Sequence, residues 1–514
     1  MLVCLILVTL SLYVTQRTYS YSSDDVSWQT ILLTWRPFSG QKAYVGAKDN
    51  FLVNVPFILF FDHIFKLGRT QLLVEAIFFA LLNFILFYFA ALYFLKKAKV
   101  TLNYFSLFPF IMLASFASGL ASMFLNTNWR DYEVGVSFVF YMLAAKYYFD
   151  EIKLFASLKS IILTIIALCI GSLFTYSDPY FFYFTLLPII GFFIVLYALK
   201  RISKYKMLVI VVFSFGALLT ARVLTSILAR VGLLAPRGSL SRTSLHNLPR
   251  TLNLVLQGLK DIFGLNSYHS IIFILLGGFT IFAVTIILGL TLFGHKIYAT
   301  SQKIIETKVW ERFFGLVTLY VLLAYIASDN GTPGSDRYLF LIVYLLTLLI
   351  LINISRMRKI VRLSVTAVIS LIVIANTLTL ANQALNSGTR TKLVNTKNYQ
   401  IIAVIKTLGL NKGYAEYWDG DINTYLSGDT INFLPVTCHE GKTQPLPLLV
   451  NGGSFTKKSG TTFFVIDPTH NNPSICSESQ VVAQFGQPEK RIHVTNKLIL
   501  VYGYDLYTRM PENV

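Results

Sequence analysis

Two adjacent aspartates, Asp24 and Asp25, follow the first apolar run of the chain in the sequence YSSDDVSW. Neighbouring carboxylates repel each other, and this repulsion raises the pKa of one partner toward the range of a general base. Such a base can take a proton from an acceptor hydroxyl. We therefore expect Asp24 and Asp25 to be catalytic, with the division of roles between them left open.

A second acidic pair, Asp131 and Glu133, stands in the segment NTNWRDYE. The one-residue spacing places both side chains on the same side of an extended segment. Two carboxylates so placed can bind a divalent cation, Mg²⁺ or Mn²⁺, or organise a phosphate group. The alternative is a pair of ordinary solvated loop acids.

Several basic side chains are suited to binding the phosphate of a lipid head group, because guanidinium groups recognise phosphate through forked hydrogen bonds. Arg222 lies inside the apolar run 207–230, where a charge is costly and therefore indicates a function. The alternative is an interfacial helix whose arginines extend to the membrane surface. The expected phosphate-binding residues are Arg222, Arg237, Arg242, His246, Arg250 and Arg337.

The composition is typical of a membrane protein, with 55% hydrophobic, 15% aromatic and only 13% charged residues. Repeated apolar runs approach the roughly 20 residues that cross a bilayer as a helix. The run at 1–16 lacks a basic region before it and is expected to be a retained anchor instead of a cleaved signal peptide. About eleven spans are predicted, at 1–16, 72–95, 104–125, 134–149, 158–176, 180–199, 207–230, 270–293, 313–328, 338–354 and 361–380. The segment 51–65 is expected to be interfacial.

The lysines and arginines predict the orientation of these spans, since basic residues in short loops are retained on the cytoplasmic side. With a cytoplasmic N-terminus, the short inner loops such as KKAK and KRISKYK are rich in them, and all of the paired acids fall outside. The net charge of +19 is thus explained by topology, so nucleic acid is not an expected partner. We expect a multi-pass protein of the cytoplasmic membrane.

After residue 380 the composition becomes polar and the apolar runs shrink to strand length. We therefore predict a membrane domain at 1–380 and an extracytoplasmic α/β domain at 381–514. Helices are expected near 397–409, 419–427 and 478–485, and strands near 412–418, 430–436 and 461–467, with a closing strand pair at 490–494 and 497–504. Cys438 and Cys476 both fall in this domain and can pair in an oxidising compartment.

These features together resemble the GT-C superfamily of polyprenyl-phosphate-dependent glycosyltransferases, in particular the protein O-mannosyltransferases and aminoarabinose transferases. The resemblance rests on Asp24-Asp25, on Asp131 with Glu133, on about eleven spans and on the α/β tail. The tail segment Tyr417-Trp418-Asp419-Gly420 also resembles the Trp-Trp-Asp motif of oligosaccharyltransferases, with tyrosine replacing the first tryptophan. The pair is Asp-Asp where O-mannosyltransferases commonly have Asp-Glu, which leaves open which carboxylate is the base.

The resemblance implies a sugar donor linked to polyprenyl phosphate and an acceptor glycan, lipid or protein at the outer surface. We expect an inverting displacement in which Asp24 or Asp25 deprotonates the acceptor hydroxyl and lipid phosphate departs beside the arginines. Two alternatives stay open. A polysaccharide polymerase or ligase would use lipid-linked glycan and the basic segment 237–250, and a non-catalytic receptor or transporter would use the tail as a ligand-binding module.

Overall fold

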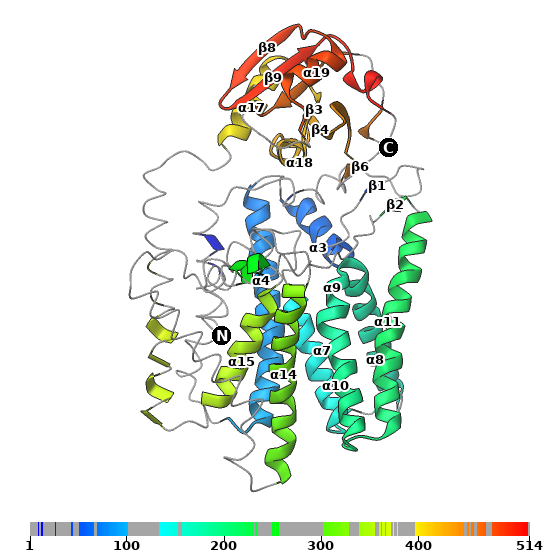
Figure 1. Ribbon diagram of the computed structural model, residues 1–514, viewed down its shortest axis with the longest axis vertical. Coiled ribbons are helices and arrows are strands. Elements are labelled where there is room, and N and C mark those ends of the chain that lie inside the picture. Colours follow the sequence, from blue (N-terminus) through cyan, green and yellow to red (C-terminus); the bar gives the residue numbers. More distant parts are fainter. Residues whose placement is uncertain are drawn as a thin grey trace.

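The computed structural model divides the protein into a bundle of membrane-type helices and a separate α/β domain seated on one end of the bundle (Figure 1). The residues that the structure describes are 51–65, 69–100, 133–152, 157–230, 302–327, 339–354, 396–446, 450–451, 454–456, 460–468 and 475–511, with shorter pieces at 9, 12–13, 26, 43–44 and 232–234, within 249–255 and within 359–378.

The described part of the bundle contains five helices that are long and apolar enough to cross a membrane. Four are α4 (Arg69–Lys97), α8 (Leu158–Ser177), α11 (Lys204–Arg230) and α14 (Gln302–Ala327); the fifth runs from α9 (Pro179–Phe181) through the π-helix η1 (Phe182–Leu186) into α10 (Leu187–Ala198). They correspond to predicted spans 72–95, 158–176, 180–199, 207–230 and 313–328. The protein is therefore a multi-pass helical membrane protein.

The other predicted spans are shorter or fall outside the described residues. Helices α7 (Glu133–Tyr148) and α15 (Phe340–Ile354) match two of them, with 16 and 15 residues. The spans 104–125 and 270–293 lie outside the described residues, 1–16 lies mostly outside them, and 361–380 is described only in part. The total of eleven spans therefore stays a prediction. The segment expected to be interfacial forms the 14-residue helix α3 (Phe51–Ile64), too short to span a bilayer.

Local sequence explains the sharp turn between α8 and α9. The backbone N–H of Asp178 donates to Phe174 O at 2.7 Å and closes α8, while its carboxylate accepts from Tyr180 N at 2.9 Å and caps α9. Pro179 occupies the first position of the new helix, where its missing N–H costs nothing. One residue thus ends one membrane helix and starts the next.

Small and polar residues bring α4 and α7 into close contact. A Cβ added to Gly135 would lie 2.7 Å from Asn83 O and 2.8 Å from Leu86 Cβ, so only glycine fits there. The amide of Asn83 connects three helices, since its Oδ1 accepts from Gly135 N at 2.6 Å and its Nδ2 donates to Tyr344 Oη at 3.0 Å. Ser137 and Thr185 share a hydrogen bond of 2.7 Å that links α7 to η1.

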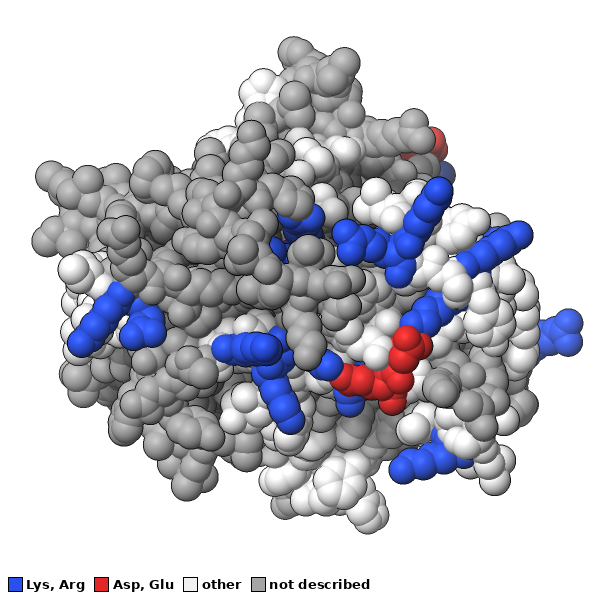
Figure 2. Space-filling model, turned by 90° about the horizontal axis from the view of Figure 1, so that it is seen from below, with Lys and Arg blue, Asp and Glu red and all other residues white. Residues whose placement is uncertain are grey.

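Basic residues gather on the end of the bundle farthest from the α/β domain (Figure 2). Described residues in the helix ends and loops there are Lys96, Lys97, Lys99, Lys146, Lys159, Lys200, Arg201, Lys204, Lys206, Lys308, Lys359 and Arg362. Asp150 pairs with Lys206 at 2.7 Å, and Glu151 pairs with Lys97. The structure therefore separates a basic end from the end that carries the α/β domain.

The α/β domain is built on a mixed sheet with the strand order β5-β4-β3-β7-β9-β8. Its central strands β4, β3 and β7 are parallel, and β5, β9 and β8 pair antiparallel at the two sides. The strands are β3 (Lys412–Glu416), β4 (Asn432–His439), β5 (Lys442–Pro445), β7 (Thr462–Ile466), β8 (Lys490–Val494) and β9 (Lys497–Tyr502). The helices are α17 (Thr396–Thr407), α18 (Tyr417–Leu426), α19 (Glu478–Phe485) and the 3-10 helix η6 (Leu506–Arg509).

The predicted α/β class of this domain is confirmed, and each predicted helix and strand has its counterpart. Cys438 at the end of β4 and Cys476 before α19 form a disulfide. Apolar side chains fill both faces of the sheet, as expected of parallel strands covered by helices. The predicted boundary at residue 380 lies among residues that the structure does not describe.

Candidate functional site at the interdomain face

Most of the expected site residues lie outside the described part of the chain. These are Asp24, Asp25, Asp131, Arg237, Arg242, His246 and Arg337. Their roles as base, cation or phosphate ligands stay predictions. The described members are Glu133, Arg222, Arg250 and the two disulfide cysteines.

Glu133 is the first residue of α7 and is only 5% exposed. A carboxylate at this position interacts favourably with the partial positive charge of the helix N-terminus. Its burial contradicts the alternative of a solvated loop acid, because such a side chain would face water. Glu133 is therefore built into the bundle end that carries the α/β domain.

The two described arginines are exposed, unlike Glu133. Arg222 is exposed on α11, on the same stretch of surface as Leu219, Val223 and Ile227. That apolar surface is typical of a helix face toward lipid. Arg250 is likewise exposed. The two described members of the expected phosphate-binding set are thus at the protein surface.

Two further carboxylates of the membrane domain, Glu75 and Asp178, are also buried. Glu75 is fully buried in α4, about one turn inside an apolar span, and Asp178 is fully buried between α8 and α9. An ionisable residue inside a membrane span is itself a signal of function, and that signal identifies Glu75 from sequence. Asp178 follows α8 in the short connection YSDPY, and its role as the N-cap of α9 explains why an aspartate occupies this position.

Hydrogen bonds between the helices fix the relative depth of the three acids. The Asn83–Gly135 bond sets α4 against α7 and places Glu75 about 9 Å nearer the α/β domain than Glu133, at a rise of about 1.5 Å per residue. The Ser137–Thr185 bond similarly places Asp178 about 4 Å nearer than Glu133. Glu75, Glu133 and Asp178 therefore occupy one layer, about 9 Å deep, at the same end of the bundle.

The α/β domain attaches to this end through α18. Tyr425 Oη donates to Gln71 Oε1 at 3.2 Å, and Gln71 Nε2 donates to Glu75 Oε1 at 2.9 Å. Val26, Leu72, Ile422 and Tyr425 form a small apolar cluster around these bonds. A chain of hydrogen bonds thus connects the α/β domain to the uppermost buried carboxylate.

A short sheet adds a second connection between the two parts. Strand β1 (Ala43–Tyr44) pairs with β2 (Leu233–Leu234) on one side and with β6 (Val450–Asn451) of the α/β domain on the other. Strand β1 lies 18 residues after Asp25 in the sequence. Strand β1 is therefore held between the end of α11 and the α/β domain.

Three carboxylates surround Lys497 at the carboxyl ends of the parallel strands. Its Nζ lies 2.5 Å from Asp419 Oδ2, 3.1 Å from Asp467 Oδ2 and 3.3 Å from Glu416 Oε1. Burial, followed by the charge of Asp419, raises the pKa of Glu416. Burial opposes the charge on Lys497, but Asp419 and Glu416 outweigh it and raise its pKa. These groups form a structural ion cluster at the start of α18.

The aromatic pair of the YWDG segment stands at the start of α18. The rings of Tyr417 and Trp418 meet edge to face at 5.1 Å between centroids, and Trp418 remains 50% exposed. The third residue of the segment, Asp419, is engaged by Lys497. Trp418 therefore offers an aromatic surface on the helix that faces the membrane domain.

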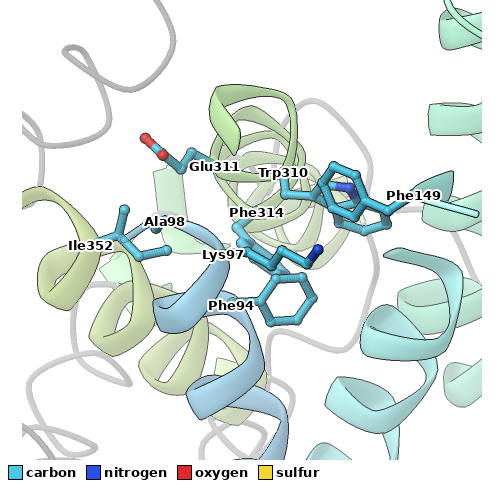
Figure 3. A pocket seen from close by; sticks show the side chains of 8 residues that line it. All are labelled: Phe94, Lys97, Ala98, Phe149, Trp310, Glu311, Phe314 and Ile352. Carbon is cyan, nitrogen blue, oxygen red and sulfur yellow. The ribbon is translucent and has the colours of Figure 1, made fainter. Parts of the chain in front are cut away.

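A small pocket at the basic end of the bundle does not contribute to this site (Figure 3). Lys97 lies 4.7 Å from the centroid of the Phe149 ring, and the buried Glu311 carboxylate points away from it. The cavity volume is about 10 Å³, which holds one water at most. The pocket is occupied by the cation–π contact between Lys97 and Phe149 and lies at the end of the membrane domain opposite the α/β domain.

Among the residues that the structure describes, no group of three or more histidine, cysteine, aspartate or glutamate side chains is arranged to hold a metal ion. The expected Mg²⁺ or Mn²⁺ site depends on Asp24, Asp25 and Asp131, and it stays a prediction. No protein-family model matches the sequence, and a search of curated proteins found no match.

Proposed function

We propose that this protein is a membrane glycosyltransferase of the GT-C type, which transfers a sugar from polyprenyl phosphate to an acceptor at the outer face of the cytoplasmic membrane. One observation carries the proposal. The α/β domain attaches through α18 to the end of the bundle that contains the buried carboxylates Glu75, Glu133 and Asp178, opposite the basic end. A lipid-linked donor and a water-soluble acceptor could meet at such a junction.

The orientation is part of the proposal. The basic end, rich in lysine and arginine, is assigned to the cytoplasm because such residues resist export. The α/β domain and the loop containing Asp24 and Asp25 are then outside. The Cys438–Cys476 disulfide supports this assignment, since disulfides persist in oxidising compartments.

The proposed reaction needs one base and no nucleotide. Asp24 or Asp25 removes the proton of the acceptor hydroxyl, the hydroxyl oxygen attacks the anomeric carbon, and the bond to the lipid phosphate breaks with inversion. Phosphate is a good leaving group without protonation. Arginines of the segment 237–250 and Arg337 stabilise its charge, and Asp131 with Glu133 can hold a divalent cation against it.

The test is transfer of labelled sugar by the purified protein in proteoliposomes. Polyprenyl-phosphate monosaccharides and a lipid-linked oligosaccharide are supplied separately, with empty liposomes as the control. The proposal expects transfer from a monosaccharide donor with release of polyprenyl phosphate. Consumption of the oligosaccharide alone would indicate a polymerase or ligase, and the absence of transfer from every donor would contradict the enzyme assignment.

A further inference from the structure

An apolar groove runs between α10 and α14 in the half of the bundle nearest the basic end. Its walls include Leu187, Gly191, Val195 and Leu199 from α10 and the turn after it, and Leu316 and Tyr320 from α14. The groove has a volume of about 410 Å³, within the range of small-molecule sites. Val195 is 50% exposed and Leu199 64% exposed, so the groove opens sideways, toward lipid.

The groove owes its depth to a missing side chain. A Cβ added to Gly191 would meet no atom within 4 Å, so glycine at this position is not required for helix packing. Glycine also weakens a helix interior by about 1 kcal/mol relative to alanine. Gly191 therefore leaves open a space that almost any other residue would fill.

The length of the groove matches one leaflet of a bilayer. From Leu187 to Leu199 the chain advances 12 residues, which corresponds to about 18 Å along a helix. Half of the hydrocarbon core is about 15 Å. A single acyl chain lying along α10 would thus reach from the membrane midplane to the head-group level.

The head-group end of the groove is basic. Arg312 lines the groove itself, and Leu199 is followed directly by the exposed residues Lys200 and Arg201. Lys200 and Arg201 follow the end of α10, and Arg312 lies about one turn inside the apolar span of α14 that begins at Lys308. Arginine binds phosphate oxygens through forked hydrogen bonds, so this end favours an anionic head group.

We propose that the α10–α14 groove is a binding site for an anionic phospholipid, with one acyl chain along α10 and the phosphate at Arg312. The site lies in the leaflet at the basic end, across the bilayer from the junction at which the sugar donor is proposed to react. It goes beyond the proposed function and does not depend on it.

Native mass spectrometry of the full-length protein in mild detergent tests this proposal. The protein is mixed with phosphatidylglycerol, phosphatidylcholine or polyprenyl phosphate, and bound lipid is counted for the wild type and three variants. Gly191→Leu fills the groove, and Arg312→Gln removes the head-group charge. Gly216→Leu on α11 is the matched control, since a Cβ there would be 3.6 Å from its nearest neighbour and the residue does not line the groove.

The wild type and Gly216→Leu should retain one phosphatidylglycerol in preference to phosphatidylcholine. Gly191→Leu and Arg312→Gln should each weaken that retention by about tenfold, the effect expected of losing the space or a charged hydrogen bond. Elution volume and melting temperature verify that each variant is folded. Equal retention of phosphatidylcholine, a preference for polyprenyl phosphate, or wild-type retention by Gly191→Leu would overturn the proposal.

Discussion

Tyr425 of the α/β domain donates a hydrogen bond of 3.2 Å to Gln71, the third residue of membrane helix α4. Both side chains are fully buried, and Gln71 Nε2 in turn donates a hydrogen bond to Glu75 Oε1. The bond therefore joins the soluble part of the protein to the carboxylate layer at the end of the bundle.

Tyr425→Phe removes this bond and keeps the ring in its apolar cluster. We expect the attachment of the α/β domain to weaken by about 1 kcal/mol, because the Gln71 oxygen loses a buried donor. Hydrogen exchange of α18 should become faster. The control is Tyr399→Phe on α17, whose side chain is 36% exposed. Unchanged exchange in Tyr425→Phe would show that the bond does not hold the domain.

Gly135→Ala should destabilise the membrane domain by about 1–3 kcal/mol, because the added methyl group would overlap the backbone of α4. The change is read as a fall in the melting temperature of the detergent-solubilised protein. Gly191→Ala is a matched control, since it introduces the same group into open space and should leave the melting temperature equal or slightly raised. Equal effects at the two positions would contradict the close α4–α7 contact.

Lys497→Met should destabilise the α/β domain by about 3–5 kcal/mol, since the buried Glu416 and the half-buried Asp419 and Asp467 lose their shared cation. Pulse proteolysis in a urea series measures the effect on this domain in the full-length protein. Lys442→Met changes an exposed lysine of β5 and should leave the midpoint within error. A midpoint for Lys497→Met equal to that of Lys442→Met would show that the ion cluster adds no stability.

Glu416→Gln should alter how the stability of the same domain depends on pH. Burial and Asp419 raise the pKa of Glu416, so the folded domain favours its protonated form. The favourable contribution is complete below the ordinary value of 4.5 and is lost as pH rises through the raised pKa. Glutamine cannot ionise, so the variant should gain stability relative to the wild type over that interval. Parallel pH profiles of the two proteins would refute this assignment.

The sequence predicts the membrane class and the α/β domain because both produce local patterns in the length and spacing of apolar residues. Apolar runs such as 72–95 are long enough to indicate membrane spans, and the strand at 461–467 is bounded by turn residues. The boundaries of α19 were predicted at 478–485 and are found at those residues, where Ser477 and Gln480 form a capping box.

The candidate site is less accessible to such reasoning because it depends on packing. Nothing local to Tyr425 indicates that it meets Gln71, which is 354 residues away in sequence. Glu75 was available to a sequence argument as a charge within a span, yet its depth relative to Glu133 follows only from the Asn83–Gly135 bond. The short strands β1, β2 and β6 were likewise not predicted, since two residues carry no periodicity.

The most direct measurement of the central claim is transfer of labelled sugar from polyprenyl phosphate by Asp24→Asn and Asp25→Asn beside the wild type. Asp429→Asn is the matched control, because Asp429 is an exposed residue of the α/β domain with a positive φ that asparagine also tolerates. The account predicts that the control transfers sugar like the wild type and that at least one of the other two loses about 100-fold or more, the contribution typical of a general base. Full transfer by both Asp24→Asn and Asp25→Asn would contradict it.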